Sequence, residues 1–146
     1  MLVSKKLRII LLEDEKAISD LLRKIIQGFG HEVLAFSDPT ACFFCKNYGA
    51  KCPQEYPCAD VILSDNMMPN LRGIDYLKLL RTRNCKILDE NQALMSAAVS
   101  QKHQEEIHAL GCQFFPKPFM INTLQSWLNE CAARVSEDRL LADLEV

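Results

Sequence analysis

Short apolar runs alternate with helical periodicity along most of the chain, and this alternation constrains the fold more than any other feature. The run Leu7–Leu12 follows a charged start and is almost entirely apolar, as expected of a strand buried on both faces. Between Ile18 and Phe29, apolar residues then recur at the spacing of one helix face. A strand followed by a helix, repeated, is typical of a parallel sheet covered by helices.

The alternation continues through four more strand–helix units. Strands are expected at Val33–Phe36, Val61–Ser64, Ala93–Met95 and Cys112–Phe115, and helices at Asp38 to about Lys46, Gly73 to about Arg83, Gln101–Leu110 and Ile121–Cys131. The pattern predicts an α/β fold, a doubly wound five-stranded parallel sheet with helices on both faces. In such sheets the functional crevice lies beyond the carboxyl ends of the strands.

The length of 146 residues suits one ordinary domain and is too short for this unit plus a second domain of full size. We expect a domain over residues 1–134, with an irregular cysteine-rich insertion at about 47–58. Residues 135–146 are expected to form a C-terminal helical extension or a tail.

Charge and hydropathy exclude several functions. Lys and Arg total 17 against 19 Asp and Glu, a near balance that argues against a broad surface for nucleic acid. No apolar run approaches the roughly 20 residues needed to span a bilayer. The N-terminus lacks the apolar segment and cleavage site of a signal peptide. We therefore expect a cytoplasmic protein with no direct contact to nucleic acid or membrane.

Reactive side chains follow the predicted strands at ends that would share one edge of the sheet. Glu13 and Asp14 follow the first strand, Asp65 ends the third, Ser96 ends the fourth and Lys117 follows the fifth. Crowded carboxylates repel one another, and a hard cation with oxygen ligands, such as Mg²⁺, relieves this. Such a site suits phosphoryl transfer, with Asp65 as nucleophile, Lys117 as a positive charge and Ser96 as a hydroxyl donor.

In order, spacing and context these residues resemble the response-regulator receiver family of two-component and phosphorelay signalling, over about residues 6–131. The matching segments are Ile9–Glu15, Val61–Pro69 with Gly73, Ala93–Ala97 and Phe115–Phe119. The resemblance implies a flavodoxin-like strand order 2-1-3-4-5, a stand-alone single-domain type and a Lys117–Pro118 cis peptide. It also implies a signalling module that catalyses only its own phosphorylation and dephosphorylation.

By this resemblance Asp65 is the phosphoacceptor, and Glu13 and Asp14 form an acidic pocket. Mg²⁺ would be held by Asp14, Asp65 and the backbone carbonyl of Met67, with Glu13 acting through a water. The implied phosphoryl donor is a phosphohistidine of a sensor histidine kinase or a phosphotransfer protein.

The family also implies a switch. The phosphoryl group draws in the Ser96 hydroxyl, and the ring of Phe114 moves into the space that the hydroxyl vacates. The face from the helix at 101–110 to the helix at 121–131 would then control a downstream protein whose identity the sequence does not reveal.

Three features depart from the family's common pattern. Glu13 stands where Asp is commoner, and Phe114 lacks the phenolic hydroxyl of the commoner Tyr. Met67 and Ala98 are apolar where many relatives carry polar groups that can orient a hydrolytic water. We therefore predict slow self-dephosphorylation.

Seven cysteines are unusual in a chain of this size. Four of them run C-x2-C-x6-C-x5-C, at Cys42, Cys45, Cys52 and Cys58. They could bind Zn²⁺ or an iron–sulfur cluster, which would make the chain a metal- or redox-sensing module on a receiver scaffold. The alternative is that they are small apolar fillers or free thiols. The other three, Cys85, Cys112 and Cys131, are predicted to be packing residues.

An enzyme of the haloacid-dehalogenase type also uses an Asp nucleophile at a strand end with Mg²⁺. That chemistry needs a second Asp two residues later as general acid, and this chain has Met67 there. The chain also lacks room for a cap domain. His31, His103 and His108 show no catalytic or metal-binding spacing, and we predict that they are surface or helix residues.

Overall fold

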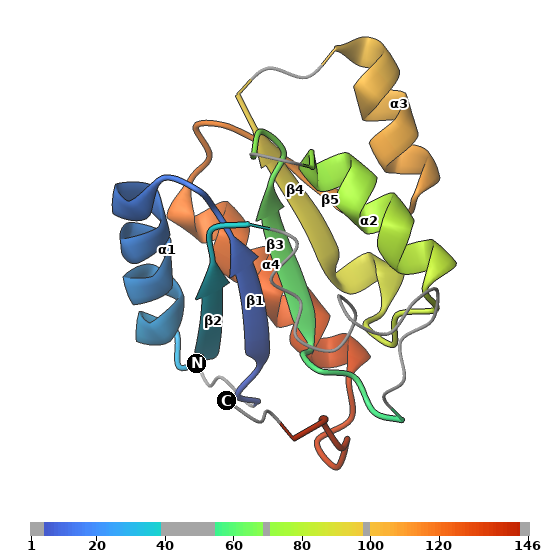
Figure 1. Cartoon of the computed structure of the whole chain (residues 1–146). Helices are drawn as coiled ribbons and strands as arrows, with labels where there is room; N and C mark the ends of the chain where they lie inside the picture. The colour runs from blue at the N-terminus through green and yellow to red at the C-terminus, as the bar shows by residue number, and fades with distance from the viewer. Residues whose placement is uncertain (1–4, 39–54, 69–70, 98–99, 144–146) are drawn as a thin grey trace.

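The computed structural model describes residues 5–38, 55–68, 71–97 and 100–143. These residues form a five-stranded parallel sheet in the order β2-β1-β3-β4-β5 (Figure 1). The elements are β1 (Arg8–Leu12), α1 (Lys16–Gly28), β2 (Glu32–Phe36), β3 (Val61–Asp65), α2 (Gly73–Thr82), the 3₁₀ turn η2 (Asp89–Asn91), β4 (Gln92–Ser96), α3 (Gln101–Ala109), β5 (Gln113–Pro116) and α4 (Ile121–Arg134). The predicted flavodoxin-like α/β fold and strand order are confirmed.

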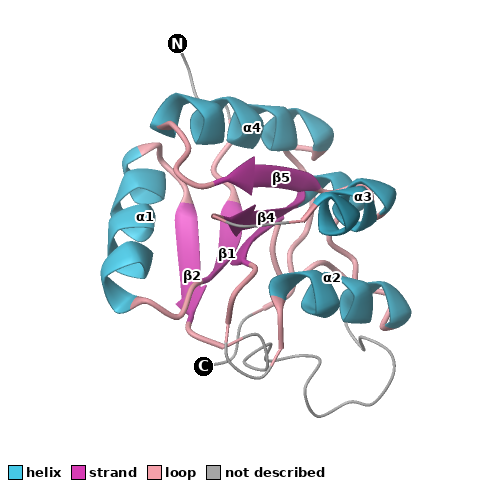
Figure 2. Ribbon diagram, turned by 90° about the horizontal axis from the view of Figure 1, so that it is seen from above, coloured by secondary structure: helices cyan, strands magenta, loops and turns pink. Residues whose placement is uncertain are grey.

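The strands are apolar on both faces because helices cover both faces. On one side, Leu11 of β1 belongs to a buried cluster with Ile26 of α1 and Trp127 of α4. On the other, Leu12 of β1 packs in a cluster that includes Leu77 of α2. Figure 2 shows α4 and α2 on opposite sides of the strands. Alternate residues of each strand thus face different helix pairs, which explains why the strand signal is a continuous apolar run.

Two strands extend beyond their apolar residues. The structure continues β3 to Asp65 and places Ser96 at the end of β4. In the parallel register Asp65 lies opposite Met95, and Ser96 lies opposite Pro116 of β5. The ladder itself therefore brings the last residues of β3, β4 and β5 to the same edge of the sheet.

The cysteine-rich insertion lies largely outside the described residues, as do the expected helix from Asp38 to about Lys46 and three of the four spaced cysteines, Cys42, Cys45 and Cys52. Cys58 is described and is half-buried against the cluster formed by α2 and α3. The metal site at these cysteines stays a prediction.

The three remaining cysteines lie where a packing role would place them, and Cys85 and Cys112 are half-buried against the cluster that includes Leu77 of α2. Cys131 is fully buried in the cluster under α4, and burial raises the pKa of its thiol to about 12. Burial likewise raises the pKa of Cys112 to about 11. Both thiols are therefore poor nucleophiles at neutral pH.

The segment after α4 folds back across the amino edge of the sheet, where β1 and β3 begin. Within its described part, up to residue 143, it makes a turn and forms no helix. The guanidinium of Arg139 binds both oxygens of Asp60, at 2.6 Å each. Ala142 is buried and donates its amide to the carbonyl of Pro57 at 2.8 Å. We call this segment, residues 136–143, the C-terminal strap.

His31 corrects one prediction made from the sequence. It is buried rather than at the surface, and its Nδ1 accepts a hydrogen bond from the amide of Leu7 at 3.1 Å. Burial lowers the pKa of His31, and the negative charge of Asp60 opposes this in part. The prediction failed because a single His between a helix and a strand, here α1 and β2, carries no periodic signal. His103 and His108 lie on α3, as expected.

Candidate functional site

The acidic residues sit where β1 and β3 end. The amide of Glu13 donates to the carbonyl of Phe36 at 3.0 Å, which ties the end of β1 to the end of β2. The Glu13 side chain is buried, and its Oε2 accepts from the amide of Glu15 at 3.2 Å. Asp65 is also buried, whereas Asp14 is exposed. The site therefore has a buried floor and one carboxylate open to solvent.

Four of the five side chains predicted to converge do so. Carboxylate oxygens of Glu13, Asp14 and Asp65 all lie within 4.8 Å of one another. The Nζ of Lys117 lies 2.9 Å from Oδ1 of Asp65 and 3.4 Å from Oε1 of Glu13. Residues at or just after the ends of three strands, β1, β3 and β5, thus form one charged cluster at the carboxyl edge of the sheet.

Burial and charge shape the titration of this cluster. Burial raises the pKa of Glu13 above its usual value, and the neighbouring charge of Asp65 adds to this, although the Glu15 amide and Lys117 oppose it. Burial alone would lower the pKa of Lys117, but its hydrogen bonds and ion pairs with Asp65 and Glu13 outweigh burial and raise it. Lys117 is therefore held as a cation beside the carboxylates.

The cluster fits a hard divalent cation. Mg²⁺ prefers oxygen ligands and is commonly bound through one or two carboxylates. Among the parts of the chain that the structure describes, this is the one group of three or more His, Cys, Asp or Glu side chains placed to share an ion. The predicted acidic pocket is consistent with a site for Mg²⁺ and phosphorylation.

Ser96 ends β4 at the sheet edge that carries the acidic cluster, whereas Phe114 lies further back on β5, opposite Leu94. Ser96 is buried, and its carbonyl accepts from the amide of Lys117 at 2.8 Å, so the two residues are held together through the backbone. The ring of Phe114 is half-buried against the cluster that includes Ile107 of α3. The peptide between Lys117 and Pro118 is cis, as the family resemblance implies.

Asn66, which the sequence reasoning did not single out, and Gly73 hold the loop after Asp65. Asn66 is buried and makes hydrogen bonds to β4 and to the first turn of α2. Gly73 packs so closely that a Cβ there would lie 2.5 Å from the backbone oxygen of Asp65. A polar residue directly after a nucleophilic Asp was the available signal for Asn66. Met67, next in the chain, is 64% exposed, whereas Ala98 lies outside the described residues.

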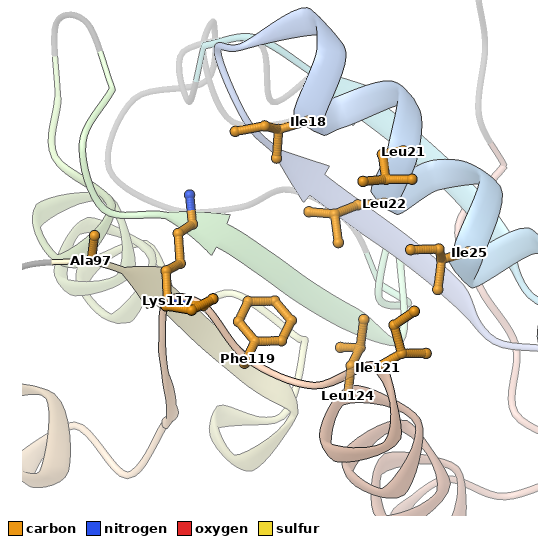
Figure 3. Close-up of a pocket in the computed structure, with 10 residues that line it drawn as sticks. Ile18, Leu21, Leu22, Ile25, Ala97, Lys117, Phe119, Ile121 and Leu124 are labelled. Carbon is orange, nitrogen blue, oxygen red and sulfur yellow. The ribbon is translucent and has the colours of Figure 1, made fainter.

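An apolar groove of about 520 Å³ opens beside the cluster. Figure 3 shows Leu22 and Ile25 of α1 on one wall, facing Phe119 and Leu124 across the groove. Lys117 lines the groove as well as the acidic cluster, so the two features are continuous. Leu21, on the rim, is 58% exposed.

Comparisons with known proteins agree with this geometry. The family model of the response regulator receiver domain matches residues 9–129. The chain therefore belongs to this family: it is a receiver domain of two-component signalling, a signalling module rather than a classical enzyme. Receiver domains are phosphorylated by histidine kinases. No curated protein matches the chain. None of the helices in the described residues is long and apolar enough to cross a membrane.

Solved structures show the same fold. The receiver domain of Francisella response regulator 1452 is 26% identical with a TM-score of 0.71, over 88% of this chain and 98% of that one. The chemotaxis response regulator CheY4 of Vibrio cholerae is 21% identical with a TM-score of 0.67, over 87% and 99% of the two chains. A receiver domain protein of Clostridium thermocellum is 21% identical with a TM-score of 0.70, over 87% and 94%.

Proposed function

We propose that Asp65 accepts a phosphoryl group from a phosphohistidine of a sensor histidine kinase or phosphotransfer protein. The observation that carries the proposal is the 2.9 Å contact between the Lys117 amine and the Asp65 carboxylate, inside the cluster with Glu13 and Asp14. A carboxylate nucleophile, a fixed cation and a ligand set for Mg²⁺ are the elements that phosphoryl transfer requires.

In the proposed step one carboxylate oxygen of Asp65 attacks phosphorus. An O–P bond forms, the P–N bond to the donor imidazole breaks, and its electron pair stays on the imidazole nitrogen. Mg²⁺ would be held by Asp14, Asp65 and the Met67 carbonyl, with Glu13 acting through a water, and would supply charge neutralisation for the phosphoryl oxygens. Lys117 exchanges part of its contact with Asp65 for a phosphoryl oxygen.

The same arrangement supports a switch. Ser96 is buried at the end of β4, beside the phosphoacceptor strand, and its hydroxyl is a donor for a phosphoryl oxygen. Phe114 lies one strand further along and already contacts the cluster under α3. We propose that phosphorylation draws in the Ser96 hydroxyl and buries the Phe114 ring further. Since Phe has no hydroxyl, differential burial of the ring must carry the shift of the face from α3 to α4.

The apolar groove supports a protein donor. Its walls are aliphatic and aromatic, and it begins at Lys117, so a helix of the donor seated there would deliver a phosphohistidine directly to Asp65. Leu21 and Ile121, 58% and 51% exposed at the rim, would be covered by that helix. A partner of this kind removes exposed apolar surface that a free receiver leaves in water.

A small phosphodonor tests the proposal without the natural partner. Acetyl phosphate is added with and without Mg²⁺, and the intact mass of the protein is measured. We expect one phosphoryl adduct that depends on Mg²⁺, and none in Asp65→Asn. The Asp75→Asn variant, at a half-buried carboxylate on α2 that pairs with Arg72, is the matched control and should form the adduct normally. An adduct that persists in Asp65→Asn would mean that another residue is the acceptor.

A further inference from the structure

Asn66 is a buried amide placed directly after the proposed phosphoacceptor. It is 4% exposed, and hydrogen bonds hold it at three points. The backbone amide of Asn66 donates to the carbonyl of Met95 on β4 at 2.9 Å. Its backbone carbonyl accepts from the amide of Gly73 at 2.9 Å, and its side-chain Oδ1 accepts from the amide of Ile74 at 3.0 Å.

These contacts take the place of a local cap on α2. The first amides of a helix have no carbonyl within the helix to bind, and a side chain at the N-cap usually accepts from one of them. The N-cap of α2 is Arg72, which makes no such bond. Asn66 lies at the far end of the loop that leads to Gly73. Its backbone carbonyl and its Oδ1 instead accept from the first two amides of the helix. The hydrogen bonds of Asn66 therefore tie the start of this loop to the helix that follows it, so that the loop is closed.

The closed loop carries two proposed ligands of the cation. Asp65 provides a carboxylate and Met67 a backbone carbonyl, and they are the immediate chain neighbours of Asn66. Gly73 reinforces the closure because its Cα packs against the Asp65 and Asn66 backbone with no room for a side chain. The position of Asn66 thus determines how the two ligands stand relative to each other and to β4.

We propose that Asn66 is a positioning residue for the phosphorylation site: by pinning the loop to α2 and β4 it holds the Asp65 carboxylate and the Met67 carbonyl in the geometry that binds Mg²⁺. The inference rests on the proposed function of Asp65. The Asn66 side chain would touch neither the metal nor the phosphoryl group. Its role would be to preorganise the Asp65 carboxylate and the Met67 carbonyl, which bind them.

The test is a Mg²⁺ titration of the unphosphorylated protein by calorimetry. Asn66→Leu is nearly isosteric and removes the acceptor for the Ile74 amide. We expect its dissociation constant for Mg²⁺ to rise about tenfold, the usual effect of losing a group that orients metal ligands. Adduct formation with acetyl phosphate should slow at low Mg²⁺ and recover when Mg²⁺ is saturating.

A second buried asparagine is a matched control. Asn91 is 0% exposed and binds the carbonyl of Asp60 at the opposite end of β3. Asn91→Leu should destabilise the fold while leaving the affinity for Mg²⁺ unchanged. Asn66→Asp keeps an acceptor, so the Ile74 amide should stay protected from hydrogen exchange and Mg²⁺ should bind at least as tightly as to the wild type.

The outcomes separate the two claims. Absence of an adduct in the wild type overturns the proposed function of Asp65. If Asn66→Leu binds Mg²⁺ as the wild type does, or Asn91→Leu weakens binding equally, Asn66 is only a structural residue and the inference fails. Should Asn66→Leu not fold, Asn66→Ala removes the same acceptor with a smaller side chain and is expected to weaken Mg²⁺ binding in the same way.

Discussion

Removing Arg139 should destabilise the domain far more than removing a surface arginine. Both oxygens of Asp60 bind this guanidinium at 2.6 Å. The Asp60 side chain is 2% exposed and that of Arg139 is 19% exposed, so water cannot replace the lost partner. In Arg139→Ala the buried Asp60 carboxylate keeps one hydrogen bond among the described residues, from the backbone amide of Arg8 to Oδ2 at 2.8 Å.

The magnitude follows from this burial. Breaking a buried ion pair by removing one partner costs about 3–5 kcal/mol. The partial exposure of Arg139 and the bond that Arg8 retains reduce this, so we expect a loss of about 2–3 kcal/mol in the free energy of unfolding. Asp60→Asn combined with Arg139→Ala should lose less than Arg139→Ala alone, because the buried charge is then removed as well.

Urea unfolding, followed by the fluorescence of Trp127 in the buried cluster under α4, measures these differences. Arg23→Ala is the control, since it breaks a solvent-exposed pair with Asp20 and should cost less than about 0.5 kcal/mol. An Arg139→Ala loss as small as the control's would refute the reasoning. It would mean that the C-terminal strap, residues 136–143, adds nothing to the stability of the domain.

Three further predictions concern single residues. Gly73→Ala should cost about 1–3 kcal/mol and slow phosphorylation, because its Cβ would meet the Asp65 backbone oxygen at 2.5 Å, whereas Gly28→Ala, with nothing within 4 Å, should be neutral or stabilising in the same urea assay. Burial lowers the pKa of His31 in the folded state. The neutral, buried imidazole therefore contributes its full share to the free energy of unfolding above the unfolded pKa of about 6.5, and this share is lost as pH falls towards the lower folded pKa. Between pH 7.5 and 5.5 the wild type should therefore lose more stability than His31→Asn, and equal losses would count against this. The aspartyl phosphate should last minutes or longer, and Met67→Asn should shorten its lifetime as followed by intact mass; a wild-type lifetime of seconds would contradict the prediction.

The sheet could be predicted because its strands are covered on both faces. Ile9, Leu11 and Leu63 must all be apolar to pack under helices, and the resulting runs are visible without any structure. The site was predictable for a related reason. Since parallel strands end at one edge, the residues that follow them converge, and Glu13, Asp65 and Lys117 meet as their positions indicated.

The residues that escaped prediction are buried polar groups whose partners lie far away in the chain. Arg139 and Asp60 are separated by 79 positions, and neither belongs to a periodic pattern. His31 is buried because one backbone amide, that of Leu7, needs an acceptor there. Asn66 replaces a cap that Arg72 does not provide. Such contacts depend on which loops meet, and that is decided by the whole fold.

The strap shows the same limit at the level of domain boundaries. The helical pattern of the chain ends with α4, so residues after 134 were expected to be an extension or a tail. In the structure Arg139 and Ala142 bind groups at the start of β3 and just before it, and Ala142 is buried. We therefore propose that the folded domain includes the strap, which the urea experiment on Arg139 tests.

The central claim, that Asp65 receives the phosphoryl group, is tested most directly by mapping the modified residue. The protein is incubated with acetyl phosphate and Mg²⁺, treated with borohydride, which reduces an acyl phosphate to the alcohol, and digested for peptide sequencing by mass spectrometry. The account predicts homoserine at position 65 and unmodified carboxylates at Glu13 and Asp14. Homoserine at another position, or a reduced Glu13, would contradict it.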